Sequence, residues 1–323
     1  MPLSDLGLNR GLLVTLVAWY VVSSVVTAVG DPAYVARQEV SFMFAKDMTA
    51  SVARVVLLLM LAGTGASGLF GVAVAYVSVS ATIDLIVLRV RLRQFKTPER
   101  HAPFGLLRRH FAFALGSQSA ALVSAIPTYT TPTLVAALIG ARSSAYVAIP
   151  LQIGALLTVI PSMTAQSLLA ELSRDPSAVV VTTTRALRGA YVVTLPAAVL
   201  LVIGAPYVLA VFGATYSAHG TPFLRWIAAG GIFFVFNYVS DIVLLARHKL
   251  RAYVIVNVLG AVEMMVLIVV ALEHGLRWIG PAWFIGQGLY AAISVIALFG
   301  YLGKGGTRVA LLTILRPRSI QKP

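Results

Sequence analysis

The sequence predicts an all-α protein that crosses a membrane many times. Hydrophobic residues occupy 59% of the 323 positions and charged residues 11%, whereas soluble globular domains average about 45–50% and about 25%. The apolar residues form runs near the length of about 20 residues that a transmembrane helix needs. Most basic residues lie between these runs. Composition and spacing together predict a polytopic membrane helix bundle.

We expect about nine transmembrane helices. The first three lie at 11–29, 49–65 and 67–88, and the other six at 105–128, 144–166, 186–204, 223–245, 251–271 and 281–302. The run from 105 could continue past Pro127 and Pro132 as a bent helix, but we favour helix ends at Pro132 and Pro206. Pro150 and Pro161 fall inside the fifth run, where a proline kinks a helix.

The connections between these runs alternate in charge. Alternate connections and the tail from residue 304 hold 21 of the 25 Lys and Arg residues, and the other connections hold only Arg10, Arg142, Arg225 and Arg277. Because basic residues are retained on the cytoplasmic side, we expect the C-terminus in the cytoplasm. Nine helices then put Met1 outside. Either a short N-terminus is translocated or helices before the first run are missing, and we favour the second interpretation.

Several function classes are disfavoured. The formal net charge of +14 would indicate nucleic-acid binding only on a soluble basic face. The chain has no cysteine, and its five histidines form no ligand pair at helical spacing. Phosphate-loop, protease and esterase motifs are absent. A membrane glycosyltransferase needs an acid in an aqueous loop, and the predicted external loops offer only Asp5 and Glu273. We therefore expect no enzyme, metal, cofactor or nucleic-acid partner.

Two segments resemble a family of membrane transporters. Residues 205–216 (APYVLAVFGATY), followed by 222–226 (PFLRW), are similar to a "P…L..FG..Y…A…L+" segment of Wzx-type polysaccharide flippases. Residues 138–150 and 160–162 are similar to the start and the Pro-bearing end of that family's eighth helix. The chain thus resembles the multidrug/oligosaccharidyl-lipid/polysaccharide exporter superfamily over its C-terminal two-thirds.

This resemblance implies a division of the chain into four parts. Residues 1–90 would be the last three helices of an incomplete N-terminal lobe, and 91–110 a basic cytoplasmic linker. Residues 111–303 would form a complete C-terminal lobe of six helices, and 304–323 a basic cytoplasmic tail. The family's two lobes face one another in a V, so this chain would hold one and a half of them.

The function implied is the flipping of a polyprenyl-diphosphate-linked oligosaccharide across the bacterial plasma membrane, by alternating access, for cell-surface polysaccharide biosynthesis. The implied partners are the lipid bilayer, this lipid-linked oligosaccharide and a polysaccharide polymerase or glycosyltransferases. Two alternatives stay open. One is a small-molecule or drug exporter of the same fold, and the other is a non-transporting component or truncated remnant of a polysaccharide assembly system.

Polar residues inside apolar runs are the candidate binding groups, because an unpaired polar group in hydrocarbon is costly. Arg142 and Arg225, within the family-like segments, are candidates to hold a diphosphate, since a guanidinium binds phosphate in a bidentate manner; an interfacial anchor is the alternative. We expect Gln118 and Gln152 to line a cavity. For the Ser and Thr residues at helical spacing within 117–128 and 158–162, we favour helix packing.

Three acidic residues lie in or near the apolar runs. Asp84 and Asp241 each have an arginine within about two turns, so we expect either salt bridges or side chains that snorkel to the membrane interface. Glu263 lies near the middle of its run, six residues after Asn257, where an ionised carboxylate is costly. Glu263 and Asn257 are therefore candidates for coupling transport to protons or cations, and structural pairing with a polar neighbour is the alternative.

Overall fold

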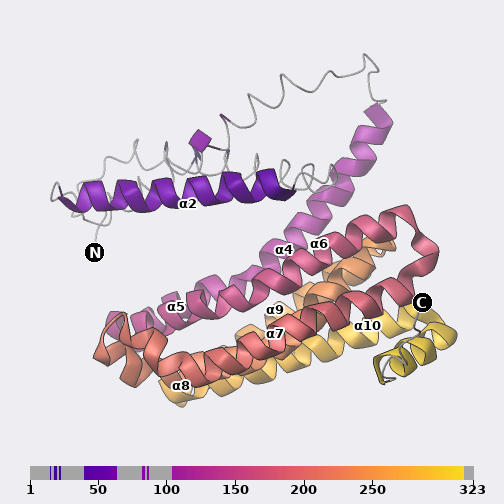
Figure 1. Cartoon of the computed structure of the whole chain (residues 1–323). Helices are drawn as coiled ribbons and strands as arrows, with labels where there is room; N and C mark the ends of the chain where they lie inside the picture. Colours follow the sequence, from indigo (N-terminus) through magenta and orange to yellow (C-terminus); the bar gives the residue numbers. More distant parts are fainter. Residues whose placement is uncertain are drawn as a thin grey trace, which may run out of the picture. The chain divides into compact units, whose positions relative to one another are not determined.

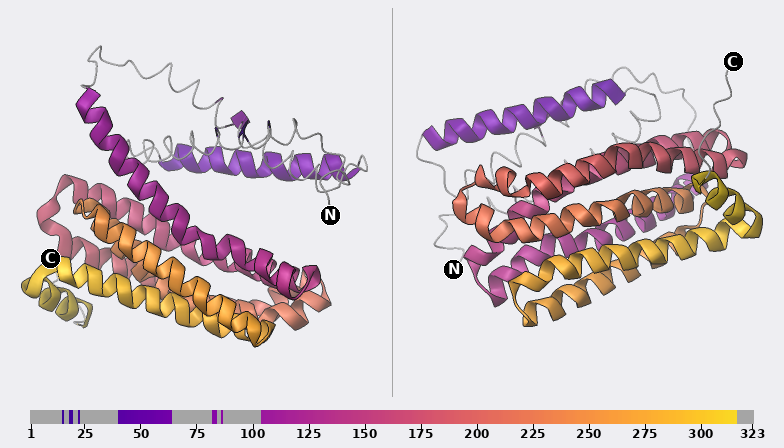
Figure 2. Two further views of the ribbon diagram at one scale, coloured as in Figure 1. Left: turned by 180° about the vertical axis from the view of Figure 1, so that it is seen from behind. Right: turned by 60° about the horizontal axis from the view of Figure 1, so that its bottom comes forward.

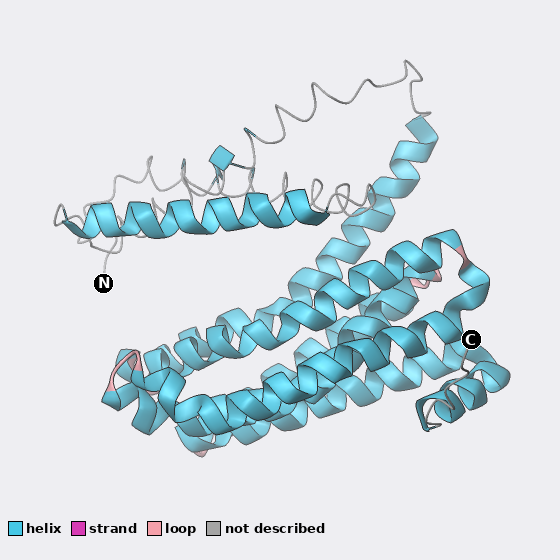
Figure 3. Ribbon diagram, viewed as in Figure 1, coloured by secondary structure: helices cyan, strands magenta, loops and turns pink. Residues whose placement is uncertain are grey.

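The computed structural model describes residues 40–63 and 104–315, together with the single positions 15, 18, 19, 22, 82, 83 and 86. Every element that it assigns in these residues is a helix (Figure 3). The predicted all-α class is therefore confirmed over the described part of the chain. The chain divides into two compact units, Met1–His101 and Ala102–Pro323.

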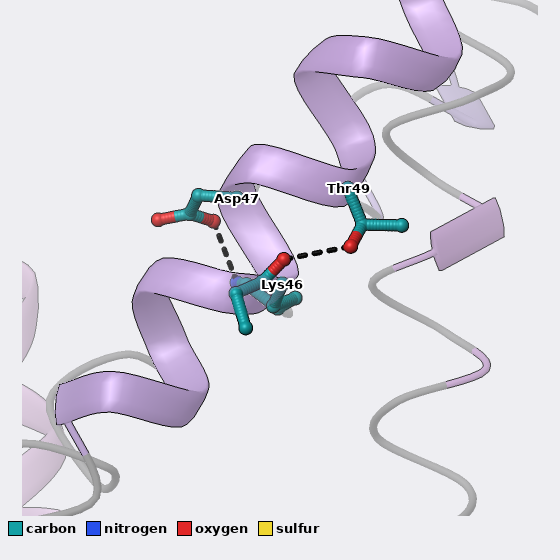
Figure 4. Close-up of polar contacts among 4 residues, drawn as sticks. Lys46, Asp47 and Thr49 are labelled. Atoms are coloured by element: carbon teal, nitrogen blue, oxygen red, sulfur yellow. Dashed lines mark hydrogen bonds and ion pairs between the residues drawn. The ribbon is translucent and has the colours of Figure 1, made fainter.

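In the first unit, the structure describes helix α2 (Val40–Gly63). This helix overlaps the predicted run at 49–65 but begins nine residues earlier. Lys46 is buried, and its Nζ lies 3.4 Å from Asp47 Oδ1, while Thr49 Oγ1 donates to a backbone carbonyl 2.7 Å away (Figure 4). The neighbouring carboxylate offsets part of the cost of burying an ammonium group.

The second unit is a lobe of long helices (Figure 1). A short 3₁₀ segment, η2 (Leu156–Thr158), joins two of them, α5 and α6, into one continuous stretch. The helices are α4 (Phe104–Leu138), α5 (Ala141–Ala155), α6 (Val159–Arg174), α7 (Val179–Ala210), α8 (Ala214–Ala246), α9 (Leu250–Glu273) and α10 (Ile279–Leu315), with 3₁₀ turns η3 (Pro176–Ala178) and η4 (Leu276–Trp278) before α7 and α10. Because α10 continues to Leu315, the predicted tail begins inside a helix.

Six segments in the described residues are long and apolar enough to span a membrane. They overlap the last six predicted runs, so the chain is a multi-pass membrane protein. The described residues hold six such helices rather than nine. The runs at 11–29 and 67–88 lie outside them apart from single positions, and α2 is not among the six. The segments are Leu115–Leu138, Ala141–Arg174, Val179–Ala210, Ala214–Ala246, Leu250–Glu273 and Leu276–Leu298.

Tight turns connect the six segments in antiparallel order (Figure 1). Gly140, Gly213 and Gly275 have φ angles of 133°, 120° and 101° and stand immediately before α5, α8 and η4. Their turns share one end of the lobe, because each follows a helix that runs in the same direction. The turns at Asp175 and at His248, whose φ is 55°, lie at the opposite end, which we call the Asp175 end.

Asp175 stabilises the turn between α6 and α7. Its Oδ1 accepts hydrogen bonds from the hydroxyl and from the backbone N–H of Ser177, the latter at 3.0 Å. Both bonds favour the ionised carboxylate, so they hold the pKa of Asp175 below its usual value. At neutral pH, Asp175 therefore carries a negative charge in the turn that connects α6 and α7.

Helix α8 is the centre of the lobe. It packs against α5, α6, α7, α9 and α10, whereas α4 packs against α5 and α9. Figure 2 shows the same lobe from behind and from below. Of the apolar window of α8, 61% is buried, compared with 17% in α4 and 22% in α7. The outer helices instead expose residues such as Leu200 and Ile203, as expected of surfaces that face lipid.

The helices continue through their prolines. Pro127 and Pro132 lie inside α4, and Pro206 lies inside α7. The helix ends that the sequence predicts at Pro132 and Pro206 are therefore wrong. Pro150 lies inside α5 and Pro161 in the first turn of α6, on either side of η2. The fifth span thus changes its helical pitch between these two prolines.

The orientation of the lobe can be tested by labelling, because the chain has no cysteine. We expect Ala214→Cys and His274→Cys to react with a membrane-impermeant maleimide on intact cells, since the positive-inside rule puts that end outside. Ser177→Cys and His248→Cys, at the Asp175 end, should react only after permeabilisation. All four positions are exposed. Labelling of the second pair on intact cells would contradict the orientation.

Candidate functional site

A cavity of about 650 Å³ lies inside the lobe, between α4, α5, α6, α8, α9 and α10. Its volume is within the range of about 300–1,000 Å³ found for small-molecule sites. Asp241 is the one charged residue among the described residues that line it. The polar lining residues are Gln118, Ser124, Thr128, Thr158, Ser162, Gln166, Asn237, Asp241, Asn257 and Gln287, and the aromatic ones are Tyr129, Phe234, Tyr238, Tyr253, Trp283 and Tyr290.

One wall of the cavity carries hydroxyl groups from α4, η2 and α6. Ser124, Thr158 and Ser162 each donate to a carbonyl three residues earlier in the same stretch of helix, at 2.7–2.8 Å. These bonds stay within one segment, whereas Thr158 also has a side-chain hydrogen bond with Tyr238 of α8. The structure places these positions at the cavity, and their role in helix packing stays a prediction. Their oxygens keep lone pairs that can accept hydrogen bonds.

The opposite wall is organised around Asp241 of α8. Asn257 of α9 donates from Nδ2 to Asp241 Oδ1 at 3.2 Å and to Tyr253 O at 2.9 Å. Tyr290 of α10 has its hydroxyl 3.2 Å from Asp241 Oδ2 and 3.0 Å from Asn257 Oδ1. Asp241, Asn257 and Tyr290 thus join three helices in one network, which we call the Asp241 network. The predicted salt bridge of Asp241 is wrong, because within the described residues its partners are these two neutral groups.

Gly260 makes room for the Asp241 network. A Cβ atom at Gly260 would lie 2.5 Å from Tyr290 Cδ2, closer than side-chain carbons approach one another. The absent side chain therefore lets the Tyr290 ring pack flat against α9. In membranes, small residues at helix contacts serve this purpose generally.

A second polar contact lies beside the network. Asn237 of α8 donates from Nδ2 to Gln287 Oε1 of α10 at 3.2 Å. Asn237 Oδ1 and Trp283 Nε1 are buried and have no hydrogen-bond partner among the described residues. Since buried polar atoms are nearly always paired, these two atoms are exceptions within the described wall residues.

The two glutamines predicted to line a cavity have different environments in the structure. Gln118 lines the cavity, whereas Gln152 is exposed on α5 and is not among the lining residues. Gln152 thus does not line this cavity, and its predicted substrate-binding role stays a prediction. Residue 152 lies on the face of α5 opposite Gly154, which packs against Ile227 of the central helix.

The two residues predicted to couple transport to protons or cations, Asn257 and Glu263, also have different environments. Asn257 belongs to the Asp241 network, while Glu263 lies partly buried on α9 outside the cavity lining. The two carboxyl oxygens of Glu263 are buried and have no hydrogen-bond partner among the described residues. The pairing alternative therefore finds no support, and the coupling role of Glu263 stays a prediction. The third acid, Asp84, lies outside the described residues.

Arg142 belongs to an aromatic cluster at the end of the lobe opposite Asp175. Its Nε donates to Tyr146 Oη at 2.9 Å. The Tyr146 ring stacks on His219, with centroids 4.9 Å apart, and meets Tyr216 edge-on at 5.3 Å. This contact orients the exposed guanidinium group, and Arg142 does not line the cavity.

Arg225 lies deeper than the sequence predicts, because α8 begins nine residues before the predicted run. Its Nε donates to Val202 O of α7 at 3.2 Å. Pro206 has no N–H, so Val202 O lacks the usual partner four residues later. Arg225 therefore supplies the missing donor between two helices. This contact gives Arg225 a structural role, and its predicted diphosphate role is untested.

Most of the cavity wall was not singled out from the sequence. Gln287 and Tyr290 stand three residues apart in the last span, as Asn237 and Asp241 stand four apart in α8. Polar residues at such spacing share a helix face, so this pattern is the signal that could have found them. Comparison with protein-family models, curated proteins and solved structures finds no match for this chain.

The close contact at Gly260 predicts a sharp effect of one methyl group. We expect Gly260→Ala to displace Tyr290 and to lower the free energy of unfolding by about 1–3 kcal/mol, as overpacking does. Gly189→Ala is the matched control, because no atom lies within 4 Å of a Cβ atom at residue 189. The only effect there is the higher helix propensity of alanine relative to glycine, which favours the folded state. Thermal unfolding in detergent measures both. A Gly260→Ala protein as stable as the control would contradict the packing argument.

The contact of Arg225 predicts a rescue. We expect Arg225→Met to cost about 1–3 kcal/mol, because Val202 O loses its donor. Pro206→Ala restores the helix N–H, so adding it to Arg225→Met should recover most of the loss. Pro196→Ala, which restores an N–H to a different carbonyl of α7, that of Val192, is the control and should not rescue. If the change in unfolding free energy of the double variant equals the sum of the changes for Arg225→Met and Pro206→Ala, this explanation is wrong.

Proposed function

We propose that this protein moves a polyprenyl-diphosphate-linked oligosaccharide across a bacterial plasma membrane, with the sugar in the lobe's cavity. The observation that carries the proposal is the cavity itself, about 650 Å³ inside a membrane-spanning lobe and lined by hydroxyl, amide and aromatic groups. The proposal keeps the sequence-based arrangement of about nine spans in one and a half lobes, with a cytoplasmic C-terminus.

The chemistry of the wall supports a sugar as the occupant. Sugar hydroxyls donate and accept, and the wall offers both kinds of partner in its amides and hydroxyls. Aromatic rings such as Tyr129 and Tyr238 add apolar faces for the C–H groups of a sugar ring. Ligand sites typically combine apolar surface with polar groups that fix the orientation of the ligand, and this wall offers both.

A second candidate is a small-molecule exporter of the same fold. Asp241 favours it, because a carboxylate without a cationic partner among the described residues attracts a positively charged compound. The two candidates differ in what Asp241→Asn would do. The substitution should strongly reduce export of a cationic compound, whereas a neutral sugar retains the amide as a hydrogen-bond partner.

Blocking the cavity tests the proposed function. We expect Ser124→Trp, which places a large ring at the cavity wall, to reduce surface polysaccharide at least about tenfold when the chain complements a flippase-deficient strain, as the loss of about 1.4 kcal/mol in binding would. Leu200→Trp is the control, because residue 200 is 70% exposed on α7 and faces lipid. Surface polysaccharide measured on whole cells gives the result.

Two outcomes would contradict the proposal. One is a wild-type chain that is inserted in the membrane but leaves surface polysaccharide absent. The other is a Ser124→Trp chain that restores as much polysaccharide as the Leu200→Trp control. If only the accumulation of cationic compounds responds to Ser124→Trp, the second candidate replaces the first.

A further inference from the structure

A separate groove of about 370 Å³ lies between α6 and α7, away from the cavity. Its polar side chains include Ser167 and Glu171 of α6 and Arg185 of α7, and all three are exposed. Met163, 45% exposed, forms its apolar part. None of these residues lines the cavity of the proposed function, so the groove is a distinct feature of the lobe.

The groove holds one acid and one base on opposite walls. Glu171 and Arg185 form no salt bridge with one another in the structure, although both line the same groove. Two opposite charges that face one groove without meeting present a dipole to whatever lies between them. The complementary ligand carries a cationic group at one position and an anionic group at the other.

The depth of these charges matches the headgroup layer of a bilayer. Glu171 stands three residues from the end of α6 and Arg185 six residues from the start of α7, which is about 4.5 Å and about 9 Å along the helices. The headgroup layer of each leaflet is about 5–8 Å thick, and a long arginine side chain reaches back toward it. Met163 lies a further two turns toward the hydrocarbon.

We propose that the groove between α6 and α7 binds a zwitterionic phospholipid with a primary amine, its ammonium group at Glu171 and its phosphate at Arg185. The ammonium group donates to the Glu171 carboxylate, and the guanidinium donates to phosphate oxygens; both are charge-assisted hydrogen bonds. The acyl chains follow the groove past Met163. Phosphatidylethanolamine has this chemistry.

The acid distinguishes this ligand from an anionic lipid. A polyprenyl diphosphate or a phosphatidylglycerol would satisfy Arg185 but would leave Glu171 facing negative charge, which is unfavourable. A lipid with a quaternary ammonium group carries the positive charge but has no N–H to donate. The site therefore ranks a primary-amine lipid above a quaternary-amine lipid, and both above an anionic one.

The test measures which lipids the full chain retains. The wild-type protein, in nanodiscs with equal phosphatidylethanolamine and phosphatidylglycerol, is extracted and its bound lipids are quantified by native mass spectrometry. We expect phosphatidylethanolamine to be enriched on the order of tenfold, since one charge-assisted contact is gained and one repulsion avoided. Glu171→Gln should abolish this preference, and Arg185→Gln should reduce retention of both lipids.

Controls separate this site from general lipid binding. Glu273→Gln removes an exposed acid at the opposite end of the lobe and should leave the enrichment unchanged. On the wild-type chain, phosphatidylethanolamine should raise the melting temperature, whereas its N-acetylated form, which has lost the ammonium charge, should not. Equal retention of the two lipids by wild type, or an enrichment unchanged in Glu171→Gln, overturns the proposal.

Discussion

The lobe depends on how the carboxyl group of Asp241 is accommodated among packed helices, five residues before the end of the central helix α8. Hydrocarbon offers no hydrogen-bond donors, so Asp241 must obtain them from the protein. Asn257 and Tyr290 supply them from α9 and α10, and Tyr290 reaches α8 only because Gly260 has no side chain. One polar requirement thus fixes the relative placement of three helices. The same requirement leaves a polar wall, which becomes one side of the cavity.

The prolines pose a related problem, because each leaves a carbonyl without its usual donor. In α7 the protein solves it with Arg225, whose guanidinium reaches Val202 O from α8. The helix therefore continues through Pro206 instead of ending there. A donor from a neighbouring helix is a tertiary contact, and this is why the rule that a proline ends a helix fails in this lobe.

The sequence predicted the six described spans because hydropathy depends only on composition over about 20 residues. The sequence also singled out Gln118, which lines the cavity, and Asn257 and Asp241, whose polar side chains meet in the structure. It could not predict their partners. Asp241 bonds to residues 16 and 49 positions away, and nothing local distinguishes Asn257 from Arg247 as a partner. The position of Gln152 outside the lining of this cavity could not be predicted for the same reason, since only tertiary packing decides which face of α5 is buried.

The distribution of charge in the lobe bears on how a diphosphate-linked sugar would be handled. The one charged group in the described cavity wall is an acid, so a diphosphate would be repelled from it rather than held. The basic side chains lie elsewhere, with Arg142 in an aromatic cluster at one end and Arg185 in a groove near the other. In the proposed flippase, the sugar therefore enters the cavity while the diphosphate stays near the ends of the lobe. Such a separation places the neutral part of the substrate in the protein and keeps its charged part close to water.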